Sequence, residues 1–139
     1  MLKTDLLHPE ILAAVAAAGH GSGVLIADAK YPLATHTHPR ARRVFLNLAP
    51  GRLNAVEVAR VLAGAIPVER VHAIFPEDGQ EPAIHADFRS ALGIATMARL
   101  GREDFYSMAR EPNVCLAIAT GEQRLYACVI LTIGVVNPD

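Results

Sequence analysis

The chain has 139 residues, and its 13 basic and 14 acidic side chains leave a formal net charge of −1. It therefore lacks the basic excess of a nucleic-acid-binding domain, apart from a small arginine cluster at positions 40, 42 and 43. Hydrophobic residues make up 52% of the chain, yet no apolar run approaches the ~20 residues of a membrane-spanning helix. With two cysteines and no signal-like N-terminal block, we expect one domain over residues 1–139, in the cytoplasm.

Helices and short buried strands alternate along the sequence. In chain order the pattern predicts a helix at 9–18, a strand at 24–27, a loop at 33–39, a strand at 44–49, a helix at 55–65, a strand at 71–75, a helix at 81–92, a strand at 94–100 and a helix at 103–110. Pro9 suits a first helical turn, and Gly19 suits the stop of the same helix. Asn54 and Glu57 form a capping-box pattern at the start of the second helix.

The C-terminal part of the sequence has a different pattern. The segments VCLAIAT and LYACVILTIGVV are separated only by GEQR, which predicts two strands joined by a tight turn. The fold class expected from the whole pattern is a single α/β domain. Its sheet is mainly parallel and flanked by helices, with a C-terminal antiparallel hairpin.

Two polar side chains flank the first predicted strand. His20 lies between two glycines before the strand, and Asp28 follows it. An imidazole exchanges protons near physiological pH, although a histidine in this position can also simply interact with the helix end. Ligands of open α/β sheets bind beyond the carboxyl ends of strands, where Asp28 is expected, although an aspartate also commonly starts a turn. The functional hypothesis is that both side chains face one pocket.

Other histidines raise the alternative of a metal site. His36 and His38 point the same way if their segment is extended, and His72 and His85 are possible further ligands. No carboxylate or cysteine stands nearby at ligand spacing, so a metal enzyme ranks last among the interpretations. The glycine-rich GHGSG precedes a strand, unlike a dinucleotide fingerprint, and Ser22 lacks the context of a nucleophile elbow.

Further polar side chains occur in the last third of the chain. Arg102 opens the short fourth helix, Tyr106 lies within it, and Glu122 and Tyr126 follow. Tyr126 falls in an otherwise apolar predicted strand, which favours a buried ring whose hydroxyl needs a partner. Taken alone, Tyr126 is explained as a core residue and Arg102 as a surface charge.

Four short motifs follow one another along the chain: GHG at 19–21, D-A-x-x-P at 28–32, R-x-x-F-Y at 102–106 and T-G-E-x-x-x-Y-A at 120–127. With the opening MLKT, the His-Pro-Glu helix and the final Val-Asn-Pro, they resemble the family of sugar mutarotases that includes D-ribose pyranase and L-fucose mutarotase. No single motif is specific, but their order and spacing over the whole chain are. The resemblance favours functional roles for His20 and Asp28.

The resemblance implies an α/β fold and ring-like homo-oligomers, commonly decameric, with pockets near subunit interfaces. It implies that the protein interconverts the anomers or ring forms of a free monosaccharide, without cofactor or metal, by acid/base ring opening at a histidine. The expected catalytic residues are His20 and Asp28, and the expected sugar-binding residues are Asp28, Arg102, Tyr106, Tyr126 and Cys128. The DFY and GHG segments are similar to the fucose-type branch and FLNLAPG to the ribose type, so L-fucose is slightly favoured.

Two positions depart from the family pattern. Ser22 stands where G-H-x-D is usual, and Cys128 stands where Tyr-x-Asn is usual. A thiol offers a sugar hydroxyl far weaker hydrogen bonds than an asparagine amide. The alternatives therefore include a catalytically weakened sugar-binding or transport-associated oligomeric protein, and a purely structural oligomer subunit. The low charge and aliphatic composition favour self-association in each case, because apolar surface is left to cover.

Overall fold

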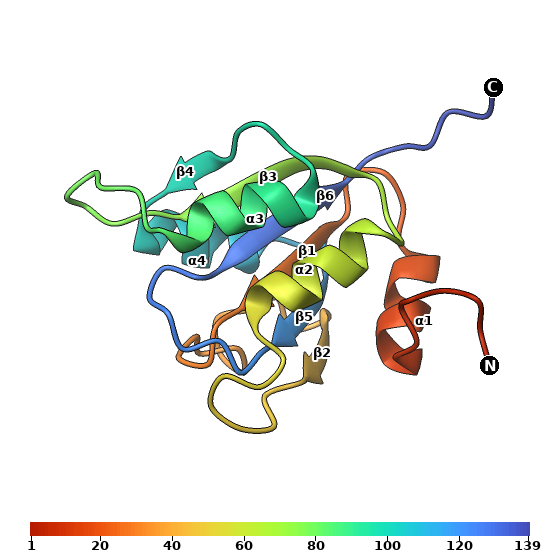
Figure 1. Ribbon diagram of the computed structural model, residues 1–139, viewed down its shortest axis with the longest axis horizontal. Helices are drawn as coiled ribbons and strands as arrows, with labels where there is room; N and C mark the ends of the chain where they lie inside the picture. The colour runs from red at the N-terminus through yellow and green to blue at the C-terminus, as the bar shows by residue number, and fades with distance from the viewer.

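The computed structural model describes all 139 residues and places six strands in one sheet with helices on both faces (Figure 1). The strands are β1 (Gly23–Ala27), β2 (Arg42–Phe45), β3 (Val68–Ile74), β4 (Ala98–Leu100), β5 (Val114–Ala119) and β6 (Val129–Ile133). The helices are α1 (Pro9–Ala17), α2 (Ala55–Ala63), α3 (Ile84–Leu92) and α4 (Arg102–Ala109). Only β6 runs against its neighbours, which confirms the α/β class with a mainly parallel sheet.

The expected C-terminal hairpin is wrong in one respect, because β5 and β6 do not pair with each other. The strand order is β2-β5-β1-β6-β3-β4, so β1 lies between them, parallel to β5 and antiparallel to β6. The segment 120–128 is long enough to cross the end of β1, whereas a tight turn would have forced the two strands together. This crossing places the connecting segment beyond the carboxyl end of β1.

The two faces of the sheet carry separate hydrophobic clusters. Val24 and Ile26 of β1 belong to a larger cluster with α1, α2 and α3, whereas Leu25 and Ala27 pack in a smaller cluster with α4. Side chains of a strand alternate between faces, and both faces of β1 are covered. This explains why the run VLIA is continuously apolar, with all four residues fully buried.

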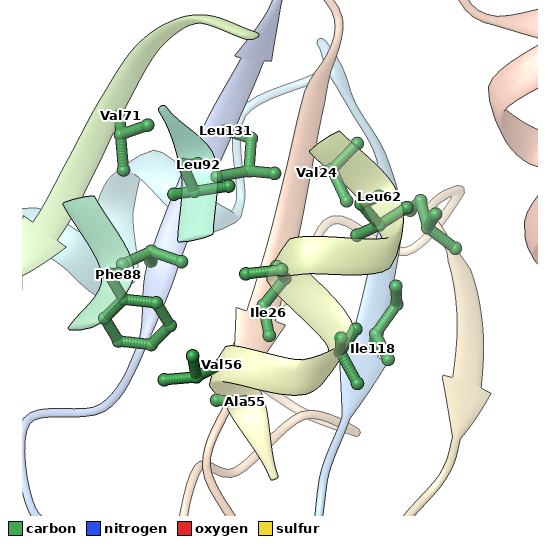
Figure 2. Packing of buried hydrophobic residues seen from close by; sticks show 14 of the residues in the cluster. Val24, Ile26, Ala55, Val56, Leu62, Val71, Phe88, Leu92, Ile118 and Leu131 are labelled. Carbon is green, nitrogen blue, oxygen red and sulfur yellow. The ribbon is translucent and has the colours of Figure 1, made fainter. Parts of the chain in front are cut away.

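The larger cluster fixes α2 and α3 over the sheet. Figure 2 shows Leu62 of α2 and Phe88 of α3 turned toward the strands that carry Val24, Ile26 and Leu131. Phe88 is 0% exposed, and truncation of such a side chain to alanine costs about 3–5 kcal/mol. On the other face, α4 and loops pack on the smaller cluster, and the partly buried rings of Tyr31, Tyr106 and Tyr126 lie against it.

Several expected element boundaries differ from the observed ones. The expected strand at 44–49 is β2, which ends at Phe45 because its partner β5 ends opposite it at Ala119. Of the expected strand at 94–100, only Ala98–Leu100 pairs, in register with the last three residues of β3. The expected helix at 81–92 begins at Ile84 and ends as expected at Gly93, whose φ is +66°.

No helix of the chain combines the length and the apolar character that are needed to cross a bilayer.

Candidate functional site

The connection between β5 and β6 is fastened across the carboxyl end of β1. The backbone N–H of Thr120 donates to the Ala27 carbonyl over 3.0 Å, and the Thr120 hydroxyl donates to the same carbonyl over 2.8 Å. One step further, the N–H of Ala29 donates to the Glu122 carbonyl over 2.9 Å. These bonds hold segment 120–128 beside Asp28, at the end of the strands where ligands of α/β sheets bind.

A pocket of about 260 Å³ opens at this place. Its lining consists of Asp28, Lys30, Tyr31, Ile74, Arg102, Tyr106, Leu125, Tyr126 and Cys128. Five of these are the expected sugar-binding residues, and they come from the turn after β1, from α4 and from the segment before β6. The fold therefore brings every expected sugar-binding residue to one cavity.

Asp28 is the buried carboxylate of the pocket, with 7% of its surface exposed. One of its oxygens, Oδ1, accepts the backbone N–H of Lys30 over 2.9 Å, while its own N–H donates to the Cys128 Sγ over 3.3 Å. The first bond closes a turn of the type that aspartate favours, so the turn predicted as an alternative role is also present. The second carboxylate oxygen accepts no N–H or O–H of the chain, and because Asp28 lines the pocket it is available to a ligand hydroxyl.

Cys128 contributes shape rather than reactivity. The side chain is 2% exposed, and burial, followed by the negative charge of Asp28, raises the pKa of the Cys128 thiol well above its ordinary value. A thiol that stays protonated is a poor nucleophile. Cys128 therefore acts as a small apolar wall beside Asp28.

Aromatic rings form another wall of the pocket. Tyr31 packs edge to face on Tyr106, with ring centroids 5.5 Å apart, and the ring of His36 lies 4.6 Å from that of Tyr106. The Tyr31 hydroxyl donates to the His36 carbonyl over 2.7 Å, and burial raises the pKa of Tyr31. This phenol stays neutral and fixed, and it supports Tyr106 at the cavity.

Arg102 is the first residue of α4 and is exposed. It takes part in none of the ion pairs of the chain, so its guanidinium is free to donate to a ligand. Arg102 and Tyr126 also border a larger, open hollow of about 620 Å³, whose remaining lining includes Glu77 and Asp104. These two residues therefore stand where the small pocket meets solvent.

Tyr126 lies in a loop and not in a strand, contrary to expectation. Its φ of +56° is in the left-handed region, which a non-glycine residue adopts only when its surroundings hold it. The holding contact comes from His85 of α3, whose Nε2 donates to the Tyr126 carbonyl over 3.0 Å. His85 is 1% exposed, and burial lowers its pKa, so the neutral ring carries its proton on Nε2.

The TGE motif has a structural task beside the pocket. A Cβ on Gly121 would lie 2.1 Å from the Arg52 carbonyl oxygen, so no side chain fits there. Glu122 is 3% exposed, and its oxygens accept from Arg124 Nε and Nη2 over 3.1 and 3.0 Å. Burial acts to raise the pKa of Glu122, but the hydrogen bonds from Arg124 outweigh it and lower the pKa.

The structure does not bring His20 to this pocket. His20 precedes β1 and Asp28 follows it, so the five residues of the strand, roughly 16 Å long, separate them. The His20 ring is exposed and pairs instead with Glu69, Nε2 to Oε1 over 3.1 Å. The expectation that one hollow of a single chain holds both side chains is wrong, because β1 carries them to opposite ends.

The other histidines serve separate local contacts. His38 Nδ1 accepts the N–H of Arg40 over 3.1 Å, and His72 lies on β3 with its buried Nδ1 unpartnered. His36 and His85 support the aromatic wall and Tyr126 as described. No group of three or more histidine, cysteine or acidic side chains is arranged to hold a metal ion.

A sequence model of the RbsD / FucU transport protein family matches residues 1–136 of the chain. The chain belongs to this family. Among curated RbsD / FucU relatives, a D-ribose pyranase of Chloroflexus aggregans is 34% identical over 137 residues, covering 98% of this chain and 99% of the relative. A D-ribose pyranase of Paracidovorax citrulli is 33% identical and covers 97% and 98%.

Solved structures of the RbsD / FucU family share the fold. Bacillus subtilis RbsD complexed with D-ribose superposes with a TM-score of 0.84 at 26% identity, covering 99% of this chain and 100% of that one. The fucose mutarotase of Streptococcus pneumoniae in complex with L-fucose superposes with a TM-score of 0.80 at 28% identity, covering 98% and 100%. The mixed sheet with its antiparallel β6 is thus the family fold.

Proposed function

We propose that this chain is an isomerase, a cofactor-free mutarotase that interconverts the anomers or ring forms of a free monosaccharide such as D-ribose or L-fucose. The observation that carries the proposal is the small pocket at the carboxyl end of β1, which gathers Asp28, Arg102 and Tyr126. Full-length similarity to D-ribose pyranases and to a fucose mutarotase supports it.

The reaction needs only proton transfer. In the ring-opening step the C1–O5 bond breaks, O5 keeps the electron pair and takes a proton, and the anomeric O1–H loses its proton as the C1=O1 bond forms. Rotation about C1–C2 and the reverse addition give the other anomer, or another hydroxyl adds and changes the ring size. The reaction proceeds unaided in water, so a positioned acid/base that contributes a typical 10²–10⁴-fold is a large part of the catalysis.

The pocket residues divide these tasks. Arg102 and Tyr126 hold sugar hydroxyls at the mouth, and the free oxygen of Asp28 accepts a hydroxyl proton further in. Tyr106 packs against an apolar face of the sugar. The volume of about 260 Å³ suits one monosaccharide and not a longer saccharide.

His20 is the proposed acid at O5, and it must come from a second copy of the chain. Within one chain, β1 separates it from the pocket by roughly 16 Å. A neighbour that places its His20 against the carboxyl end of this sheet completes the site. Repetition of that contact gives a closed ring, as the decameric assembly implied by the family resemblance requires.

L-fucose is our slightly favoured substrate, on the strength of the R-x-x-F-Y motif at Arg102. The curated D-ribose pyranases make D-ribose its direct competitor. The second candidate function is a sugar-binding oligomer with weakened catalysis, which the departures at Ser22 and Cys128 favour. The cytoplasmic location stays a prediction.

Saturation-transfer NMR on equilibrated L-fucose, D-ribose and D-galactose tests the proposal. The wild-type protein is expected to accelerate anomer or ring-form exchange for at least one of them, and His20→Ala is expected to abolish the acceleration. Calorimetric sugar binding without exchange would establish the binding-protein alternative. Exchange by His20→Ala at the wild-type rate would remove His20 as the acid.

A further inference from the structure

The exposed pair of His20 and Glu69 has two hydrogen-bond distances that are nearly equal. His20 Nε2 lies 3.1 Å from Glu69 Oε1 and 3.3 Å from Oε2, and the side chains are 57% and 47% exposed. Exposed ion pairs contribute little to folding stability. Folding stability therefore explains the contact between His20 and Glu69 poorly.

Backbone irregularities of the sheet aim Glu69 at His20. The pairing of β3 with β6 shifts register between Val68 and Arg70, and a bulge of this kind redirects the side chain of the residue it contains. Gly134 lies beside Glu69, and a Cβ on Gly134 would come within 3.0 Å of the Glu69 Cβ. A glycine at position 134 therefore leaves room for the Glu69 side chain.

The loop that carries His20 is also fixed. The Ser22 Oγ accepts the N–H of Gly19 over 3.2 Å, and Asn113 Nδ2 donates to the Gly21 carbonyl over 3.1 Å. Gly21 has a φ of +88°, which suits a glycine. Ser22, a departure from the family pattern, thus closes the turn that presents the imidazole.

We propose that Glu69 is the positioning residue of His20, and that it assigns Nδ1 as the atom that exchanges the proton with the sugar. A carboxylate only accepts hydrogen bonds, so Nε2 must carry a proton toward Glu69. The other ring nitrogen, Nδ1, makes no hydrogen bond within the chain, so it is the nitrogen left for the sugar. The inference rests on the proposed role of His20 as acid.

The first readout does not depend on activity. Solid-state ¹⁵N NMR of histidine-labelled assembled protein at about pH 8.5, with His20 assigned by loss of its signals in His20→Ala, reports which ring nitrogen is protonated. The wild type is expected to show the Nε2–H tautomer. Glu69→Gln is expected to show a mixture, because an amide both donates and accepts.

The second readout is the kinetic split. Glu69→Gln is expected to lower kcat roughly 10- to 100-fold with KM within about twofold, since the residue orients the acid without touching the sugar. Glu69→Asp keeps the carboxylate and is expected to recover part of kcat. Glu10→Gln, which removes an exposed carboxylate from α1, is the matched control and should retain wild-type values.

The outcomes separate the two proposals. An inactive wild-type protein overturns the mutarotase function, whereas the tautomer of His20 is read independently. The role of Glu69 is judged when the wild type is active, His20→Ala is inactive and Glu69→Gln assembles normally. In that case, Glu69→Gln overturns the role if it keeps either the wild-type tautomer of His20 or the wild-type kcat. If Glu69→Gln does not assemble, Glu69→Asp decides: an unchanged KM with reduced kcat supports the role, and wild-type kcat overturns it.

Discussion

At the residue scale, the pocket combines side chains that the fold holds rigidly with one that it leaves free. Asp28 and Cys128 are buried and bonded to each other through the Asp28 N–H. Arg102 is exposed and lies outside the ion pairs of the chain. Substitutions at the two kinds of position should therefore separate stability from sugar binding.

Arg102→Ala tests this separation. The free energy of unfolding is expected to stay within about 0.5 kcal/mol of wild type, because the exposed guanidinium makes no ion pair in the folded chain. KM for the sugar is expected to rise roughly tenfold with the loss of a charged hydrogen bond. Urea unfolding and exchange kinetics measure the two quantities; a large loss of stability with unchanged KM would contradict the assignment.

His85→Leu tests the support of Tyr126 from α3. Leucine leaves the half-buried Tyr126 carbonyl without its donor, which is expected to cost about 1–3 kcal/mol and to raise KM by loosening the loop. His85→Gln keeps an N–H and should recover much of both quantities. Equal losses in the two variants, measured by urea unfolding and exchange kinetics, would show that packing alone explains His85.

Glu122 gives the protein a predictable acid sensitivity. Its pKa in the folded chain is lower than the ordinary value of 4.5, so its ion pair stabilises the fold above that pH. The stabilisation is lost as the pH falls through the lowered pKa, where the folded carboxylate takes up its proton. Wild type should exceed Glu122→Gln in stability at about pH 7, and this advantage should shrink as the pH falls below 4.5; a difference in urea unfolding that stays constant as the pH is lowered contradicts the pairing.

At the element scale, the segment from β5 to β6 builds the site by crossing the end of β1. It passes so close to the loop after β2 that Gly121 leaves no room for a Cβ beside the carbonyls of Arg52 and Ala49. The backbone confirms the contact, since the Gly51 N–H donates to the Gly121 carbonyl over 2.7 Å. A side chain at this position must displace one of the two segments.

Gly121→Ala is therefore expected to destabilise the fold by about 3 kcal/mol or more and to disturb the pocket. Gly19→Ala is the matched control: a Cβ there meets nothing within 4 Å and φ is not left-handed. It should change stability by no more than about 0.5 kcal/mol. Thermal unfolding compares them, and similar midpoints for both variants would refute the steric argument.

The sequence was sufficient to predict the parts that depend on local signals. The cap at Asn54 and Glu57 is present as a full capping box, and Asp28 stands at the carboxyl end of its strand as the fold class implied. The prediction of a C-terminal hairpin was wrong. Strands adjacent in sequence usually pair, and no local signal in the sequence shows that β1 separates β5 from β6.

Long-range contacts account for the residues that sequence reasoning missed. Glu69 meets His20 from 49 residues away, and His85 reaches Tyr126 across 41 residues. Neither partner carries a motif around it. The left-handed backbone of Tyr126 was likewise hidden, because the surrounding apolar residues suggested a strand.

At the scale of the whole molecule, the two ends of the sheet carry complementary halves of the proposed site. Asp28, Arg102 and Tyr126 lie at the carboxyl end of β1, and His20 with Glu69 lies at the amino end. In a head-to-tail contact, the carboxyl end of the sheet in one copy meets the amino end of the sheet in the next copy. Each of the two copies then keeps one end of its sheet free for a further neighbour. Where the rotation between copies allows closure, such heterologous contacts give a ring, which is the assembly that the proposed shared site requires.

Complementation between inactive variants tests this account most directly. His20→Ala and Asp28→Asn, each inactive alone, are co-expressed with different tags, and the mixed oligomers are assayed by anomer exchange. If each site takes His20 from one chain and Asp28 from its neighbour, about a quarter of the sites in a random mixture are intact and exchange activity returns at about that level. Asp28→Asn co-expressed with the His20→Ala/Asp28→Asn double variant should give none. Mixed oligomers of the two single variants that remain as inactive as their parents would contradict a site shared between copies.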